Sequence, residues 1–504
     1  MAEQARPMNR RAQLSAAKRA LLGRLAKGGA EPLAESPLPA VPGDGPFPLS
    51  YAQESIWLLD RLAGQIPMFN TANAGWLPSQ VTVAGIERAL AEVVDRHDAL
   101  RTGIRVTDGE PELFLLGSVP VHVPVTAIAS TGPREREKAA CEAALAIAER
   151  PFTLDQPPLW RAEVVRFSAG EQLLVFAAHH IVVDATSLNL LIGELAGTVP
   201  SLDQPGRYVD FAVWQRDRVA SGAIAADLDH WRRELANLPP ALRLPADFPR
   251  PPVRSLAGTT LQVDLDDHLA ARLRDVSRQE RVTPYMTMLA AFTAVLYRYT
   301  GETDILIGST VAGRAERPEF RQMIGMFVNM VALRISVSGH PTFRELLGRA
   351  ARTVSASLAH QAVPFDVLIR ELGRAGDRTR PSLVQVAFNM PIQGPSAGYS
   401  RLRLPMITRG SQLDLTLHVV AGERGALRLE FEYSTDLFEA GTVRRMADHL
   451  IAILDAATRD PGVAVEEIRL ARDTGLTETL ADEPAHQAEP LHHLFERQIG
   501  RAHV

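Results

Sequence analysis

The sequence contains very little cysteine, very little lysine and no long apolar run. Cys141 is the only cysteine among 504 residues, which excludes an internal disulfide and a zinc site made of several thiolates. No stretch approaches the roughly 20 consecutive apolar residues that a membrane-spanning helix needs. Residues 1–6 carry no apolar signal region. We therefore expect a cytoplasmic protein that does not span a membrane.

Positive charge comes almost wholly from arginine, because only three of the 54 basic residues are lysines. The net charge is −5 and the pI is about 6.3, which argues against binding to nucleic acid or to an anionic membrane surface. The sequence also lacks a Gly-x-Ser-x-Gly motif, a Walker loop and a dinucleotide-binding fingerprint. Neither a covalent acyl-enzyme nor a cofactor of the protein's own is therefore expected.

The composition is that of a globular protein with several domains. Hydrophobic residues make up 46% and charged residues 22% of the chain, and one domain typically holds roughly 100–200 residues. Residues 31–48 and 244–252 are rich in proline, which favours linkers or boundaries there. The predicted divisions are an N-terminal helix and linker (1–45), a first lobe (46–245), a second lobe (246–472) and a C-terminal tail (473–504).

Hydrophobic periodicity predicts alternating helices and strands in both halves, which is typical of a layered α/β protein. Residues 14–25 are expected to form an amphipathic helix that either covers the folded body or docks a partner. In the first half we expect helices at 48–62, 86–101, 134–150, 187–197 and 225–238, and strands within 103–125 and at 159–167 and 172–178. The segment 208–216 lies between the last two helices and is given no type. In the second half we expect helices at 267–280, 283–300, 342–360 and 440–458, and strands at 261–265, 304–308, 331–337, 385–390, 413–420 and 427–433.

The most informative stretch is residues 172–184, an apolar run of strand length that ends in His179 and His180 and is followed by Asp184. A strand that delivers an imidazole at its end is a common way to build a catalytic site. Taken alone, two adjacent histidines could equally be buried core residues whose ring nitrogens all have hydrogen-bond partners. A metal site is not favoured, because neighbouring side chains on a strand diverge and no His-x-x-x-His helix accompanies them.

The segment His179-His-Ile-Val-Val-Asp-Ala185 resembles the His-His-x-x-x-Asp-Gly motif of nonribosomal peptide synthetase condensation domains. Further segments resemble other motifs of that family, in the family's order, and together they cover about residues 48–470. These segments are 50–58, 96–102, 208–215, 324–329, 360–366 and, as a weak match, 378–383.

This resemblance implies two chloramphenicol-acetyltransferase-like lobes in a V, with a tunnel between them. It implies amide formation between an acyl thioester and an amine, with the phosphopantetheine arms belonging to partner carrier proteins. The donor is either an acyl group on an upstream carrier protein or, in a starter domain, a fatty acyl group on CoA. A downstream carrier protein holds the acceptor, and the domain is expected to be a monomer.

His180 is the predicted catalytic residue. With an ordinary pKa of roughly 6.5, its imidazole is suited either to accept the proton of the amine or to stabilise the charged tetrahedral intermediate. His179 is expected to point to the other face of the strand and to be structural. The resemblance implies that Asp184 anchors the loop by pairing with Arg96, our first choice, or with Arg101.

The resemblance also assigns Ala185, Trp214, Gly325 and Asn329 to the substrate tunnel. For Trp214 we favour packing over contact with substrate. For Asn329, a hydrogen bond to pantetheine or backbone and a structural role both stay open. Ala185 stands where the family has glycine, and alanine costs roughly 1 kcal/mol if the position needs a positive φ or a close approach.

Residues 491–498 resemble the opening of an adenylation domain, so an adjoining adenylation domain is an expected partner and this chain is expected to be the first domain of a longer synthetase. That order argues against an epimerisation domain, which shares the paired histidines and the aspartate. Another alternative is a condensation-like platform that recruits carriers or tailoring enzymes without catalysis. Ala185 keeps this alternative open.

Overall fold

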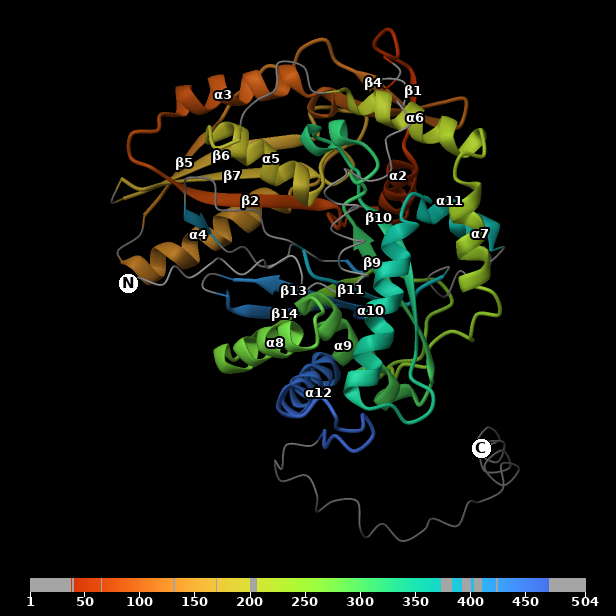
Figure 1. Cartoon of the computed structure of the whole chain (residues 1–504). Helices are drawn as coiled ribbons and strands as arrows, with labels where there is room; N and C mark the ends of the chain where they lie inside the picture. The colour runs from red at the N-terminus through yellow and green to blue at the C-terminus, as the bar shows by residue number, and fades with distance from the viewer. Residues whose placement is uncertain are drawn as a thin grey trace, which may run out of the picture.

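The computed structural model describes residues 38, 40–64, 66–129, 132–168, 170–199, 206–372, 383–391, 400–402, 410–422 and 425–470. They form two layered lobes, each built on a central sheet, and Figure 1 shows one lobe above the other. The predicted helix at 14–25 and the predicted tail at 473–504 lie outside the described residues.

The N-terminal lobe is built on a five-stranded mixed sheet in the order β12-β2-β7-β6-β5. Helix α4 covers one face of this sheet, and helices α3 and α5 lie on the other (Figure 1). A small antiparallel sheet, β1-β4-β3, packs beside helix α6. The strands are β1 (Phe47–Pro48), β2 (Asn70–Leu77), β3 (Thr102–Thr107), β4 (Glu110–Leu115), β5 (Val125–Ile128), β6 (Trp160–Phe167), β7 (Gln172–His179) and β12 (Ser400–Leu402). The helices are α2 (Tyr51–Ala63), α3 (Val83–Arg96), the short η2 (Asp98–Arg101), α4 (Pro133–Ala148), α5 (Ala185–Leu195) and α6 (Tyr208–Ala220).

The C-terminal lobe is built on a six-stranded sheet in the order β10-β9-β11-β13-β14-β8. Helices α8, α9, α10 and α12 cover the face away from the N-terminal lobe (Figure 1). The strands are β8 (Gly258–Leu265), β9 (Asp304–Val311), β10 (Asn329–Ser336), β11 (Val386–Asn389), β13 (Leu415–Ala421) and β14 (Leu427–Ser434). The helices are α7 (Ala225–Glu234), α8 (Asp267–Gln279), α9 (Pro284–Thr300), the short η3 (Pro318–Gln322), α10 (Phe343–Ala359), α11 (Phe365–Glu371) and α12 (Ala440–Arg459).

Local sequence signals explain where the principal helices begin and end. Ser50 and Gln53 form a reciprocal capping box at the start of α2. Thr283 caps α9, Pro284 occupies its first turn, and Gly301 ends it in the left-handed conformation. Helix α9 is apolar on nearly every side because it is buried between α8, α10 and α12.

Two segments from the second half of the sequence cross into the N-terminal lobe. The connection between β9 and β10, residues 312–328, inserts Phe320, Met323 and Phe327 into the N-terminal core. Strand β12 pairs antiparallel with β2 and extends the N-terminal sheet. Conversely, Trp231 of α7 packs in the core of the C-terminal lobe and donates a hydrogen bond to the carbonyl of His360. The two lobes are therefore interlocked, and the boundary predicted at 245/246 stays a prediction.

Most of the predicted helices and strands are confirmed, with ends that differ by a few residues. The prediction missed β1, β2, β12 and α11, reached only the first residue of β5, and assigned no type to the segment that forms α6. Strand β2, with the sequence Asn70-Thr-Ala-Asn-Ala-Gly-Trp-Leu77, lacks the β-branched run that favours a strand, and pairing with β7 along its whole length overrides that weak propensity. Within the described residues, no helix is long and apolar enough to cross a membrane.

Candidate active site

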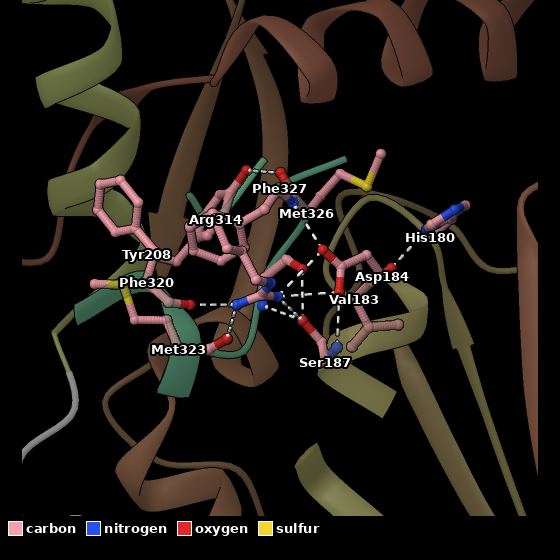
Figure 2. A network of polar contacts seen from close by, with 11 residues as sticks. His180, Val183, Asp184, Ser187, Tyr208, Arg314, Phe320, Met323, Met326 and Phe327 are labelled. Atoms are coloured by element: carbon pink, nitrogen blue, oxygen red, sulfur yellow. Dashed lines mark hydrogen bonds and ion pairs between the residues drawn. The ribbon is translucent and has the colours of Figure 1, made fainter. Parts of the chain in front are cut away.

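Both histidines lie at the end of β7, where the strand leaves the sheet. The backbone N–H of His179 donates to the carbonyl of Leu159 at 2.9 Å, and that of His180 donates to the carbonyl of Phe69 at 2.7 Å. Because the sheet holds the backbone on both sides, the two side chains have fixed and opposite directions. Figure 2 shows the ring of His180 standing at the edge of the polar network, on the side away from Tyr208.

His179 is buried and its ring is fixed by two hydrogen bonds. Its Nδ1 accepts from the backbone N–H of Ile181 at 3.2 Å, so the proton resides on Nε2, which donates to the Asp60 carboxylate at 3.3 Å. Burial lowers the pKa of His179, although the Asp60 bond opposes that shift. His179 is therefore a neutral residue that ties β7 to α2, which is the structural placement expected from the sequence.

His180 is only half-buried, and one nitrogen of its ring is occupied. The carbonyl oxygen of Val183 lies 2.6 Å from Nδ1, and a carbonyl can only accept, so Nδ1 carries the proton. Nε2 of the neutral ring is then a hydrogen-bond acceptor. Among the residues that the structure describes, no protein group donates a hydrogen bond to this Nε2. The ring therefore presents a lone pair to whatever occupies the space in front of it.

The loop that carries Val183 is held by Asp184, which is completely buried. One oxygen of Asp184 accepts from the backbone N–H of Ser187 at 2.7 Å and so caps α5. The guanidinium of Arg314 donates to both oxygens, at 3.0 and 3.1 Å, and the backbone N–H of Phe327 donates at 3.1 Å (Figure 2). The Asp184 backbone N–H completes the junction by donating to the carbonyl of Gly325 at 3.1 Å.

The expectation that Asp184 pairs with Arg96 or Arg101 is wrong, because Asp184 pairs with Arg314. Arg96 instead forms an ion pair with Glu194 on α5. Arg101 donates to the carbonyls of Val94 and Leu116, at 3.1 and 2.8 Å. Both arginines contact the N-terminal lobe, whereas the true partner of Asp184 is Arg314 of the crossing segment 312–328. The sequence motif at 324–329 covers the end of this segment but does not include Arg314.

Both terminal nitrogens of Arg314 are engaged, by the crossing segment and by the start of α5, whereas its buried Nε has no hydrogen-bond partner among the described residues. Its guanidinium donates to the carbonyls of Phe320 and Met323, donates to the Ser187 hydroxyl at 2.7 Å and lies 4.0 Å from the centre of the Phe327 ring. Every partner is shielded from water, so the charge of Arg314 depends on these contacts. Removing one member of a buried pair leaves an uncompensated charge and typically costs roughly 3–5 kcal/mol.

Gly325 is required by close packing. A Cβ atom at this position would lie 1.9 Å from Cδ2 of Tyr208. Tyr208 cannot retreat, because its hydroxyl donates to the carbonyl of Met326 at 2.6 Å and lies 2.8 Å from Oγ of Ser50. Gly325 therefore acts through the packing of the crossing segment against α6, and it is not among the residues that line the two cavities described next.

Two cavities meet at His180. The first, about 380 Å³, lies between α2, α11 and the start of β10. The second, about 440 Å³, lies between the start of β2 and the open face of the C-terminal sheet. Both are lined by Phe69, His180, Thr310, Met330, Gln412 and Leu413. His180 is the only member of this shared set with an ionisable side chain.

The other residues assigned to a tunnel divide between lining and support. Asn329 lines the first cavity, but its amide donates to the carbonyls of Gln361 and Val363 at 3.0 and 2.7 Å. Its Oδ1 accepts from the N–H of Phe365 at 3.0 Å. These bonds position the start of α11, which favours the structural role of Asn329.

Trp214 packs against Phe211 and Phe320, and it lines neither cavity. Ala185 is the exposed first residue of α5 and has no positive φ, so alanine carries no backbone strain there. The cost expected for alanine in place of the family's glycine, from a positive φ or a close approach, therefore does not arise at position 185.

The quoted motifs at 50–58 and 360–366 contain Ser55 and Asp366, but the sequence did not indicate that these two residues form an interlobe contact beside the first cavity. The Ser55 hydroxyl on α2 donates to the Asp366 carboxylate on α11 at 2.5 Å, and Asp366 lines the cavity. Burial raises the pKa of Asp366, and the Ser55 bond opposes that rise. No group of three or more potential metal ligands occurs in the described part of the chain.

Asp184→Asn tests the network directly. Asparagine keeps the cap on α5 but leaves the Arg314 charge without its anion, so we expect a loss of roughly 3–5 kcal/mol in the free energy of unfolding. Urea denaturation measures it. The matched control is Asp275→Asn, which breaks an exposed pair with Arg278 and is expected to cost less than about 1 kcal/mol. Equal midpoints for Asp184→Asn and the parent protein would contradict the role of the pair.

Gly325→Ala tests the packing against Tyr208. The added methyl has no space, so the crossing segment must shift, and we expect a destabilisation of roughly 1–3 kcal/mol. The control is Gly348→Ala in α10, where the nearest atom to an added Cβ is 3.6 Å away. Replacing a helical glycine there is expected to stabilise by roughly 0.5–1 kcal/mol. Thermal melts that move both variants in the same direction would disprove this account.

Comparison with known proteins places the chain in a family. Residues 44–478 match the family model described as Condensation domain. The chain is 36% identical over 456 residues to one of the linear gramicidin synthase proteins of Brevibacillus parabrevis, covering 88% of this chain and 6% of that protein. It is 32% identical over 517 residues to phosphinothricin tripeptide synthetase PhsC of Streptomyces viridochromogenes, covering 97% of this chain and 47% of that protein. The chain thus spans less than half the length of either relative.

Solved structures with lower identity share the fold. The condensation domain of the Monacolin K polyketide synthase MokA superposes with a TM-score of 0.75 at 23% identity, covering 84% of this chain and 99% of that one. The first condensation domain of the calcium-dependent antibiotic synthetase, in complex with a substrate analogue, gives 0.71 at 22%, covering 85% and 100%. The X-domain in complex with OxyB from teicoplanin biosynthesis gives 0.74 at 24%, covering 88% and 99%.

These likenesses confirm the predicted mixed α/β fold with two chloramphenicol-acetyltransferase-like lobes. The family model covers most of the chain, and several synthetases are more than 30% identical across most of it. The protein therefore belongs to the condensation domains of nonribosomal peptide synthetases.

Proposed function

We propose that the protein forms an amide bond between an acyl group held as a thioester and the amine of an aminoacyl group on a carrier protein. The observation that carries this proposal is the placement of His180. Its ring borders both cavities, and the bond from Nδ1 to Val183 leaves Nε2 as an acceptor. Two reactants that enter through the two cavities would meet at this atom.

The proposed chemistry needs one base and one leaving group. The amine nitrogen attacks the thioester carbon, and His180 Nε2 accepts a proton from that nitrogen as the N–C bond forms. The tetrahedral intermediate collapses when the C–S bond breaks and the thiolate leaves. The imidazolium then returns its proton to the sulfur, so the enzyme ends in its starting state.

The tautomer of the neutral His180 ring favours a role as proton acceptor over direct stabilisation of the oxyanion. An oxyanion needs a hydrogen-bond donor. In the neutral ring the donor, Nδ1–H, is bound to the Val183 carbonyl, and Nε2 can only accept. Nε2 becomes a donor only after it has taken a proton. His180 therefore acts first as a proton acceptor, and any electrostatic contribution follows from the imidazolium.

The partners follow from the chemistry of the substrates. Phosphopantetheine arms of carrier proteins deliver the acyl donor and the aminoacyl acceptor, and the domain contributes no cofactor of its own. The chain corresponds to 6% and 47% of the length of the two synthetases to which it was compared. We propose that this domain works as a monomer beside an adenylation domain. A fatty acyl-CoA is the alternative donor.

His180→Ala is expected to lower the rate of amide formation by roughly 10²–10⁴-fold, because the amine loses its proton acceptor. The measurement is intact-mass detection of the amide on a loaded acceptor carrier. The control is His268→Ala, which removes an exposed imidazole from α8. Normal product from His180→Ala would refute the assignment, provided that its melting temperature matches that of the parent.

The donor is identified with the same acceptor carrier and two sets of donors. Amide formed from an acyl-CoA panel without a donor carrier supports a starter domain. Amide formed only from an acyl group on an upstream carrier supports a domain that extends a chain.

A recruitment platform is the alternative function, because the X-domain solved with OxyB shares this fold. Carrier binding without turnover from any donor would favour the platform. The acceptor geometry at His180 is our reason to prefer catalysis.

A further inference from the structure

One wall of the second cavity is an unusually polar face of the C-terminal sheet. Side chains at alternate positions of a strand share one face, and here they are Thr416 and His418 on β13 and Glu430 and Glu432 on β14. In the strand register, His418 lies opposite Glu430 and Thr416 lies opposite Glu432. All four line the cavity that His180 also borders.

This wall carries two carboxylates, and no lysine or arginine is among the described residues that line the cavity with them, although the nearby charge of Arg428 opposes the burial-driven rise in the pKa of Glu430. Glu430 and Glu432 are the only lysine, arginine, aspartate or glutamate side chains among the described residues that line the cavity. Arg428, two positions from Glu430 along β14, forms its ion pair with Asp264 and does not line the cavity. The field inside the cavity therefore attracts a positive group.

The hydrogen-bonding capacity of the wall is only partly used. Nε2 of His418 is shielded from solvent and has no partner within the described residues, and it lies 4.0 Å from an oxygen of Glu432. Glu430 accepts one bond, from Gln262 at 3.3 Å. Glu432 accepts from the backbone N–H of Gln412, while the nearby Ser411 hydroxyl donates to the carbonyl of Leu413 at 2.7 Å. Each carboxylate can accept further bonds, and the imidazole of His418 can accept one.

Holding these groups in place lowers the stability of the folded protein. Burial raises the pKa of Glu432 to about 7 and lowers the pKa of His418 to about 4. Glutamate is ionised above roughly pH 4.5 in the unfolded chain. Above pH 7 the folded state therefore carries a buried charge that disfavours folding. Side chains that cost stability in a cavity are typical of binding sites.

We propose that this wall binds a basic group, an ammonium or a guanidinium, carried by one of the two groups that the enzyme condenses. The inference rests on the proposed function and names the substrate class that the second cavity selects. Glu430 and Glu432 supply the anionic acceptors, and His418 Nε2 and the Thr416 hydroxyl can complete the shell.

The remaining lining fits the stem of such a side chain. Met68, Phe69 and Val420 are apolar and border the same cavity. Lysine and arginine side chains carry several methylene groups, which pack on apolar surface while the charged end finds polar partners. A volume of about 440 Å³ is within the range of small-ligand pockets, roughly 300–1,000 Å³. An acidic side chain would face repulsion from both glutamates.

The test compares lysyl with norleucyl thioesters, which differ by the terminal ammonium. Each is offered first as donor and then as acceptor, and kcat/KM is measured by intact mass. We expect a preference for lysyl of at least about tenfold in one of the two positions. Glu432→Gln and Glu430→Gln are each expected to reduce that preference to within about threefold, through KM, while the norleucyl rate stays unchanged. Glu467→Gln, an exposed residue, is the control.

Folding of the key variant is checked separately. Glu432→Gln removes the buried charge, so its melting temperature is expected to exceed that of the parent at pH 8 and to equal it at pH 4.5. The titratable groups that line the cavity with Glu432 are His418 on β13, Glu430 on β14 and His180 at the end of β7. A variant that folds and still prefers lysyl by the parent's ratio would overturn the proposal.

A binding measurement separates this proposal from the proposed function. Lysyl- and norleucyl-pantetheine amides, which cannot react, are titrated into His180→Ala by calorimetry. Tighter binding of the lysyl compound that depends on Glu432 supports the basic-group site even if no amide product is ever found. Product formation by the parent with equal lysyl and norleucyl rates in both positions keeps the function and rejects the site.

Discussion

The ion pair between Asp184 and Arg314 is the constraint on which the rest of the site depends. Asp184 belongs to the first half of the chain and Arg314 to the second, and both are buried. The pair fixes the peptide next to Val183, whose carbonyl in turn fixes the tautomer of His180. This ion pair thereby determines, through Val183, which ring nitrogen of His180 is left as a hydrogen-bond acceptor, although the pair itself does not contact the ring. Buried pairs of this kind determine geometry more than they contribute net stability.

The two cavities at His180 differ in what they offer to a substrate. The first is lined largely by α2 and α11, whose relative position depends on the Ser55–Asp366 bond. The second is walled by a sheet whose cavity-facing side chains are polar and include two glutamates. Two helices from different lobes line the first cavity, whereas a strand face presents side chains at fixed spacing in the second. The walls of the two cavities that border His180 therefore differ in both composition and construction.

Much of this arrangement could be predicted from the sequence. Periodicity located most helices and strands, and the apolar run at 172–178 correctly placed both histidines at a strand end. The sequence also indicated that Asp184 anchors a loop. Its partner could not be chosen among 54 basic residues, because the crossing of residues 312–328 into the other lobe leaves no periodic signal. The pairing of β13 with β14 was predictable, because the two strands are joined by a short turn, but the register that brings His418 opposite Glu430 was not.

The interlocking of the lobes also limits how such a domain can be recombined. Strand β12 and the segment 312–328 are encoded in the second half, yet they complete the sheet and core of the first. An exchange of halves between two related domains at the proline-rich stretch 244–252 would therefore mix the Asp184 of one parent with the Arg314 of another. The N-terminal lobe is therefore built from segments that are not continuous in the sequence. A chimera that preserves its contacts must transfer β12 and the segment 312–328 together with that lobe.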